Sequence, residues 1–284
     1  MADDPKTLVS TEWLAQHLKD PDLRVIDASW YLPEAGRNAK SEYDEAHIPG
    51  ARFFDIDEIS DTASDLPHMA PPVEKFMSRM RAMGIGDGHQ VVVYDGAGLL
   101  SAARVWWLFK LMGQENVAVL DGGFPKWQSE DHPIEDMPPM VRVRHMTVRF
   151  QNHLVRDVTQ VSSASKLNDH VIIDARAANR FRGEAPEPRE GLRPGHIPGA
   201  RSVPYTDLLK ADKTMKSPDE TRKVFEAAGV DLSKPIITTC GSGVTAAILA
   251  LALARLGHNQ WSLYDGSWAE WGMFPTVPVA TGEA

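Results

Sequence analysis

Four sequence blocks occur twice in this chain, in the same order and at nearly constant separation. The first copies begin at Val25, His47, Val91 and Asp121, and the second copies begin at Ile172, His196, Ile236 and Asp265. The separations are 147, 149, 145 and 144 residues, and His-Ile-Pro-Gly-Ala-Arg is identical in both copies. Because this period is far too long for a solenoid repeat, it indicates two copies of one domain.

The length of 284 residues fits two domains of ordinary size. We expect the first domain to span residues 1–130 and the second to span residues 150–284. The stretch between them, 131–149, contains Pro133, Pro138 and Pro139 and breaks the pattern of the repeat. A stretch of this kind is typical of a linker.

Each copy alternates short apolar runs with longer helical patterns. The runs rich in β-branched residues predict buried strands at 24–28, 90–94 and 116–120, and at 170–175, 235–239 and 260–264. The helical patterns predict helices at 101–112, 220–228 and 244–256. Alternating strands and helices indicate an α/β fold in which each domain is a parallel sheet flanked by helices.

Composition excludes several classes of function. The net charge of −9 gives no electrostatic footprint for nucleic-acid binding, and no apolar run is long enough to span a membrane. The acidic start lacks the layout of a signal peptide, so we expect a cytoplasmic protein. The single cysteine excludes an internal disulfide and a cysteine-rich metal site, and the ten histidines show no paired ligand spacing. We therefore expect neither a metal nor a cofactor.

The duplication serves as an internal control for function. Features in both copies, such as His47 and His196, are expected to be structural. The loop after the third strand differs, since it reads Asp95-Gly-Ala-Gly in the first copy and Cys240-Gly-Ser-Gly in the second. This difference identifies Cys240 as the candidate for chemistry.

Cys240 is predicted to lie at a strand-to-helix turn below a helix N-terminus. Gly241 and Gly243 allow successive backbone N–H groups to point inward, and this cradle together with the helix dipole favours the thiolate, the nucleophilic form. Cysteine phosphatases have an arginine six positions after the nucleophile to clamp phosphate, but that position is Ala246 in this chain. A cysteine phosphatase is therefore disfavoured.

These residues resemble the rhodanese superfamily over roughly residues 9–279. The loop that begins at Cys240 is similar to the version found in 3-mercaptopyruvate sulfurtransferases, whereas thiosulfate sulfurtransferases carry basic residues directly after the cysteine. The resemblance implies a first domain without activity and a sulfur atom carried as a persulfide on Cys240. Two alternatives stay open, a thiosulfate sulfurtransferase and a persulfide carrier without enzymatic activity.

The resemblance also implies roles for further residues. Arg180 and Arg189, which have no equivalent in the first copy, are expected to hold the substrate carboxylate. Ser242, His68 and Asp57 are expected to form a proton-relay set, although sequence alone does not show that they meet. The remaining loop residues, Gly241, Gly243, Val244 and Thr245, are expected to contact the substrate.

The expected reaction has two steps. The Cys240 thiolate attacks the sulfur of 3-mercaptopyruvate, and pyruvate leaves as its enolate. A thiol acceptor then takes the sulfur from the persulfide. Because the chain has no second cysteine, the acceptor must be external, such as thioredoxin, a small thiol or cyanide. Neither a nucleic acid nor a membrane is expected as a partner.

Overall fold

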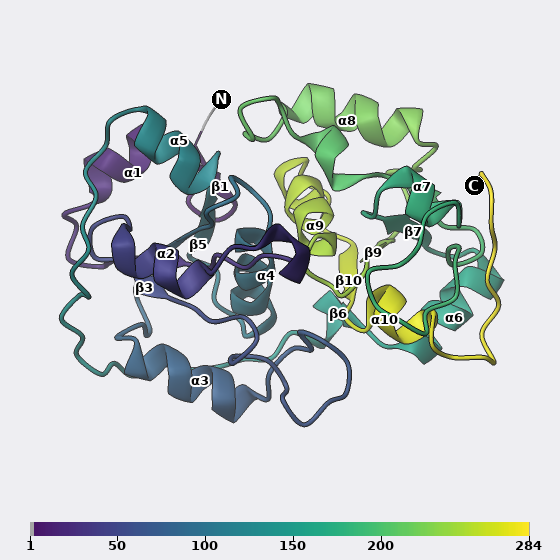
Figure 1. Cartoon of the computed structure of the whole chain (residues 1–284), viewed down its shortest axis with the longest axis horizontal. Coiled ribbons are helices and arrows are strands. Elements are labelled where there is room, and N and C mark those ends of the chain that lie inside the picture. The colour runs from purple at the N-terminus through teal and green to yellow at the C-terminus, as the bar shows by residue number, and fades with distance from the viewer. Residues whose placement is uncertain (1–2, 284) are drawn as a thin grey trace. The chain divides into compact units, whose positions relative to one another are not determined.

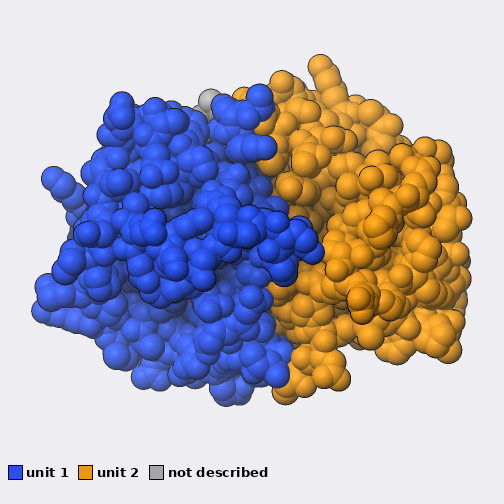
Figure 2. Space-filling view, viewed as in Figure 1, with its two compact units in different colours: residues 1–62, 70–151, 211–215 blue, residues 63–69, 152–210, 216–284 orange. Residues whose placement is uncertain are grey.

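The computed structural model describes residues 3–283, which form two compact units. Unit 1 takes in the chain up to Thr62, then Ala70–Gln151 and Ala211–Met215. Unit 2 takes in Ala63–Met69, Asn152–Lys210 and the chain from Lys216 onward, as the colours in Figure 2 show. Each unit therefore contains one short segment from the other half of the sequence. The domain boundaries at residues 130 and 150 stay a prediction.

Unit 1 is built on a parallel sheet of five strands in the order β1-β5-β4-β2-β3 (Figure 1). The strands are β1 (Leu8–Val9), β2 (Leu23–Asp27), β3 (Arg52–Phe53), β4 (Gln90–Tyr94) and β5 (Val117–Leu120). The helices are α1 (Thr11–His17), α2 (Ala39–Glu45), α3 (Val73–Ala82), α4 (Ala102–Leu111) and α5 (Gly123–Ser129), with a 3-10 turn η1 (Pro33–Ala35).

Unit 2 repeats this architecture with a sheet in the order β6-β10-β9-β7-β8, also parallel. The strands are β6 (Val155–Arg156), β7 (Val171–Asp174), β8 (Arg201–Ser202), β9 (Ile236–Thr239) and β10 (Trp261–Tyr264). The helices are α6 (Val158–Leu167), α7 (Ala178–Phe181), α8 (Pro218–Ala227), α9 (Ala246–Arg255) and α10 (Ser267–Trp271), with 3-10 turns η2 (Asn152–Leu154) and η3 (Tyr205–Leu208). The α/β fold with parallel sheets is thus confirmed for both copies.

Helices cover both faces of each sheet. In unit 1, Leu14 of α1, Tyr43 of α2 and Trp127 of α5 share one apolar cluster with the sheet, while α4 packs on β4 and β5. In unit 2, residues of α6, α7 and α10 form the corresponding cluster, while α9 packs on β9 and β10. Every residue of α4 is buried, which explains why its sequence is apolar on all sides.

The repeated histidines have structural roles. Nδ1 of His47 lies 2.7 Å from the carbonyl oxygen of Tyr43, and Nδ1 of His196 lies 2.9 Å from that of Phe181. Each imidazole stacks on the ring of the same residue, at centroid distances of 4.2 and 3.8 Å. Burial lowers the pKa of His196, which favours its neutral form. Both rings fix the turn that leads into the next strand, as their repetition predicts.

Candidate active site

Cys240 directly follows the last residue of β9, a central strand between β7 and β10. In parallel α/β sheets, sites form beyond the carboxyl ends of the strands, which is where this residue lies. The side chain is 2% exposed. Its loop is braced by the start of α10, because Trp268 N–H donates to the Cys240 carbonyl at 2.9 Å and Ala269 N–H donates to that of Gly241 at 2.8 Å.

The rest of the loop turns tightly before α9 begins. Gly243 adopts a φ of +78°, in the region where a Cβ is strained, so glycine suits this position. Val244 is buried, and Thr245 is the N-cap residue without a side-chain cap. The helix therefore begins at Ala246, two residues later than the sequence predicts, because residues 241–245 are used for the turn.

The matching loop of unit 1 shows what such a turn can hold. The Asp95 carboxylate accepts hydrogen bonds from four backbone N–H groups, those of Ala97, Leu100, Ser101 and Ala102, at 2.7–2.9 Å. Asp95 is fully buried. Because Asp95 stands where Cys240 stands in the second copy, the β-strand–loop–helix turn of this fold is able to bind an anion with backbone amides.

Ser242 and His68 lie together in unit 2. Nδ1 of His68 is 3.0 Å from Oγ of Ser242, and each side chain is 7% exposed. His68 has a φ of +60°, so its backbone is held in the left-handed region where a non-glycine residue is strained. The structure therefore brings these two members of the expected proton-relay set within hydrogen-bond distance, and their catalytic role stays a prediction.

Asp57, the third member of the predicted set, belongs to unit 1. Its carboxylate accepts a hydrogen bond from Nε1 of Trp30 at 3.1 Å. Its role beside His68 stays a prediction.

Arg180 extends from α7 to the Cys240 loop. Its Nη2 atom lies 3.3 Å from the point where a Cβ on Gly241 would stand, so the guanidinium faces the loop backbone. The Nε atom is buried and has no hydrogen-bond partner among residues 3–283. A guanidinium with an unpaired N–H is suited to a carboxylate oxygen, and the substrate-binding role of Arg180 stays a prediction.

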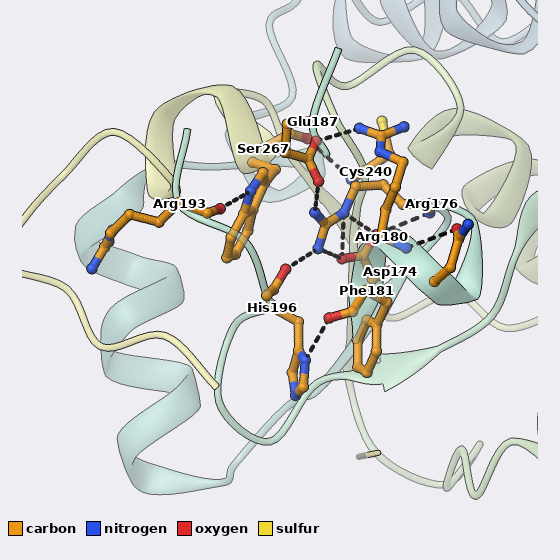
Figure 3. Close-up of polar contacts among 12 residues, drawn as sticks. Asp174, Arg176, Arg180, Phe181, Glu187, Arg193, His196, Cys240 and Ser267 are labelled. Carbon is orange, nitrogen blue, oxygen red and sulfur yellow. Dashed lines mark hydrogen bonds and ion pairs between the residues drawn. The ribbon is translucent and has the colours of Figure 1, made fainter. Parts of the chain in front are cut away.

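Arg180 belongs to a chain of alternating charges that sequence reasoning missed (Figure 3). Glu187 accepts from Nη2 of Arg180 at 2.5 Å and from Nη1 of Arg176 at 2.7 Å, and Arg176 in turn donates to Asp174 at 2.7 Å. Burial alone would lower the pKa of Arg176, but the carboxylates of Asp174 and Glu187 outweigh it and raise that pKa. The signal in the sequence is an acidic residue between arginines in the loop 176–189.

Arg189 also belongs to unit 2. It lines a cavity of about 360 Å³ together with Asp65, Leu66, Pro67, Leu192 and Met273. The segment that carries His68 forms one wall of this cavity. Whether Arg189 holds the substrate carboxylate together with Arg180 stays a prediction.

Within residues 3–283, no group of three or more His, Cys, Asp or Glu side chains is arranged to hold a metal ion. None of the helices in that range has the length and apolar character needed to cross a membrane.

The repeated architecture and the site define a class of protein. Comparison with known sequences identifies this class. The chain matches the rhodanese-like domain family twice, over residues 10–130 and 157–273, and it belongs to that family.

The relatives that resemble this chain over nearly its full length are sulfurtransferases. A 3-mercaptopyruvate sulfurtransferase from Escherichia coli (strain K12) is 45% identical, covering 95% of this chain and 96% of the relative. The rat 3-mercaptopyruvate sulfurtransferase is 42% identical, covering 94% of this chain and 92% of the relative. A thiosulfate sulfurtransferase from Cricetulus griseus is also 42% identical, covering 97% and 94%. Overall identity therefore does not separate the two sulfur donors.

Solved structures show the same fold. The crystal structure of a 3-mercaptopyruvate sulfotransferase from Escherichia coli superposes with a TM-score of 0.85 at 44% identity, covering 93% of this chain and 99% of that chain. The Tum1 protein of Saccharomyces cerevisiae superposes with a TM-score of 0.88 at 29% identity, covering 99% and 100%.

Proposed function

We propose that this protein is a 3-mercaptopyruvate sulfurtransferase that carries sulfur as a persulfide on Cys240. The observation that carries the proposal is the position of Arg180, whose guanidinium lies against the loop of the only cysteine and keeps one buried donor unused. The residues directly after Cys240 are Gly241 and Ser242, which add no positive charge. A donor with a single carboxylate suits this arrangement better than the dianion thiosulfate.

In the first step, the Cys240 thiolate attacks the sulfur of 3-mercaptopyruvate. A sulfur–sulfur bond forms, the carbon–sulfur bond breaks, and the electron pair of that bond leaves on the enolate of pyruvate. Ser242, which is hydrogen-bonded to His68, would deliver the proton that converts the enolate to pyruvate. The persulfide anion is stabilised by loop amides, as the carboxylate of Asp95 is in unit 1.

In the second step, an external nucleophile, either a thiolate or cyanide, attacks the outer sulfur of the persulfide and leaves with it, which restores the Cys240 thiolate. Thioredoxin, a small thiol or cyanide would serve as acceptor. The chain itself supplies none, because Cys240 is its only cysteine. The need for a reduced thiol also supports a cytoplasmic location, where thiols are kept reduced.

The decisive experiment supplies the purified protein with 3-mercaptopyruvate and, separately, with thiosulfate. Pyruvate or sulfite release and the intact mass of the protein are recorded. We expect faster pyruvate release and one added sulfur atom, both absent in Cys240→Ser. Faster loading from thiosulfate would overturn the donor assignment, and no loading from either donor would favour a carrier that a partner protein loads.

Two variants test the carboxylate assignment. Arg180→Ala and Arg189→Ala remove one guanidinium each, so we expect the apparent KM for 3-mercaptopyruvate to rise by roughly tenfold or more in each variant. Unchanged kinetics in both would show that the carboxylate binds elsewhere.

A further inference from the structure

The carboxylate of Glu187 lies between two guanidinium groups. Its Oε1 accepts from Nη1 of Arg176 at 2.7 Å, and its Oε2 accepts from Nη2 of Arg180 at 2.5 Å. Its side chain is 2% exposed, so both contacts are shielded from water. A carboxylate buried in this way is stable only while its cations stay in place.

Arg176 anchors Glu187 firmly. Besides Glu187, it contacts both oxygens of Asp174, donates to the Gly195 carbonyl at 2.7 Å, and lies over the Trp268 ring at 4.3 Å from the centroid. Trp268 is the residue whose N–H donates to the Cys240 carbonyl. Arg176 therefore fixes the position of Glu187, and Glu187 in turn holds the Arg180 guanidinium (Figure 3).

The same contacts set the local charge. Two arginines and two carboxylates alternate in the chain Asp174–Arg176–Glu187–Arg180, so these four side chains together carry no net charge. Arg180 thus offers oriented donors beside Cys240, while the adjacent Glu187 carboxylate cancels much of its positive potential. Such a site therefore gives little electrostatic stabilisation to a second negative charge on a bound molecule.

We propose that Glu187 is a positioning residue that also sets donor specificity: it holds Arg180 at the Cys240 loop and limits the positive potential there, which favours a monoanionic donor over a dianionic one. This inference rests on the proposed function, because it concerns the choice between 3-mercaptopyruvate and thiosulfate at that same site.

The first test compares donors in the full-length chain carrying Glu187→Gln. Removing one negative charge acts once on a monoanion and twice on a dianion, whereas loss of the anchor for Arg180 weakens the binding of both donors. The ratio of kcat/KM for thiosulfate to that for 3-mercaptopyruvate should therefore rise by about tenfold. The matched control is Glu184→Gln, which breaks the exposed pair with Arg182 in the same loop and should leave the ratio unchanged.

A second variant separates the effect of the Glu187 charge from the effect of its side-chain length. Glu187→Asp keeps the charge but shortens the side chain, so KM should rise by a similar factor for both donors and the donor ratio should stay within about twofold of the wild type. An unchanged ratio in Glu187→Gln, or an equal shift in Glu184→Gln, would overturn the specificity role. If Glu187→Gln fails to fold, a tenfold shift in the ratio of Glu187→Asp would also contradict it.

A third measurement does not depend on turnover. Because Cys240 is the only cysteine, intact mass follows its alkylation without interference. The rate with anionic iodoacetate, divided by the rate with neutral iodoacetamide, reports the potential at the thiol. We expect Glu187→Gln to raise this quotient by about threefold or more. An unchanged quotient refutes the charge argument, whereas a wild-type protein that uses neither donor refutes the proposed function alone.

Discussion

The hydroxyl of Ser242 and the imidazole of His68 are both nearly buried, and their hydrogen bond is 3.0 Å long. A hydroxyl and an imidazole in this arrangement are able to move a proton at a reacting atom. The two donors differ in this respect, since the enolate of pyruvate must be protonated whereas sulfite leaves thiosulfate without a proton. Loss of this residue pair should therefore slow the reaction with 3-mercaptopyruvate more than the reaction with thiosulfate.

Ser242→Ala should lower kcat with 3-mercaptopyruvate by about a hundredfold, in line with the usual contribution of a positioned acid or base. Persulfide formation from thiosulfate should change much less. Stopped-flow measurement of pyruvate release, beside intact-mass measurement of thiosulfate loading, checks both parts. Equal losses with the two donors would instead indicate a damaged loop.

Asp27 at the end of β2 gives a second prediction at the scale of a residue. Burial of its carboxyl raises the pKa of Asp27 from the ordinary value of 3.8 to about 6, although hydrogen bonds from Ser29 oppose this shift. The folded state therefore holds a proton that the unfolded state releases between about pH 4 and pH 6. In this window the contribution of Asp27 to stability falls as pH rises.

Asp27→Asn removes this titration. Its stability relative to the wild type should improve as pH rises from 4 to 6, by roughly 3 kcal/mol in total, and should level off above pH 7. Urea unfolding at several pH values measures the difference. A difference that stays constant with pH would show that Asp27 does not titrate in this range.

At the scale of elements, the two strand–loop–helix turns differ in what occupies them. In the turn between β4 and α4, a carboxylate from the chain itself receives four backbone N–H groups. In the turn between β9 and α9, the corresponding residue is the thiol of Cys240. The first turn is therefore closed to an external anion, as we expect of a copy that takes no part in the proposed reaction.

Asp95→Asn should destabilise the protein by about 3 kcal/mol, because an amide places N–H groups against the donors that the carboxylate satisfies. Chemical denaturation measures this loss. Persulfide loading of Cys240 in the folded variant should stay within about twofold of the wild type. A large loss of loading without destabilisation would contradict the structural role of Asp95.

The elements also show where prediction from sequence succeeds. The six central strands are predicted to within one residue at each end, because buried parallel strands read as short β-branched runs. The two-residue strands, such as β1 and β8, are too short to leave a pattern. Cys240 is found by comparing the two copies, whereas Glu187 is not, since its importance depends on two arginines that only the folded loop brings to it.

At the scale of the whole molecule, the halves of the sequence and the units of the structure do not coincide. The segment Ala63–Met69 comes from the first half of the chain but belongs to unit 2, where it supplies His68. The segment Ala211–Met215 belongs to unit 1, and Met215 N–H donates to Asp121 at 2.7 Å. Each unit is therefore built in part from the other half of the sequence.

A fragment limited to residues 150–284 would keep Cys240, Ser242 and Arg180 but lose His68. We expect it to release pyruvate about a hundredfold more slowly than the full chain, like Ser242→Ala. Circular dichroism confirms that the fragment is folded, and a coupled pyruvate assay gives the rate. Release at the full-length rate would show that His68 is dispensable.

The single cysteine has a consequence for steady-state kinetics. In the proposed reaction, the sulfur atom of Cys240 takes part in both half-reactions. Donor and acceptor therefore react with the enzyme in turn rather than together. Double-reciprocal plots at several acceptor concentrations should then be parallel lines. An acceptor in excess occupies the unloaded thiolate form and slows the donor, so the cellular rate of sulfur transfer depends on the balance between the two pools rather than on either one alone.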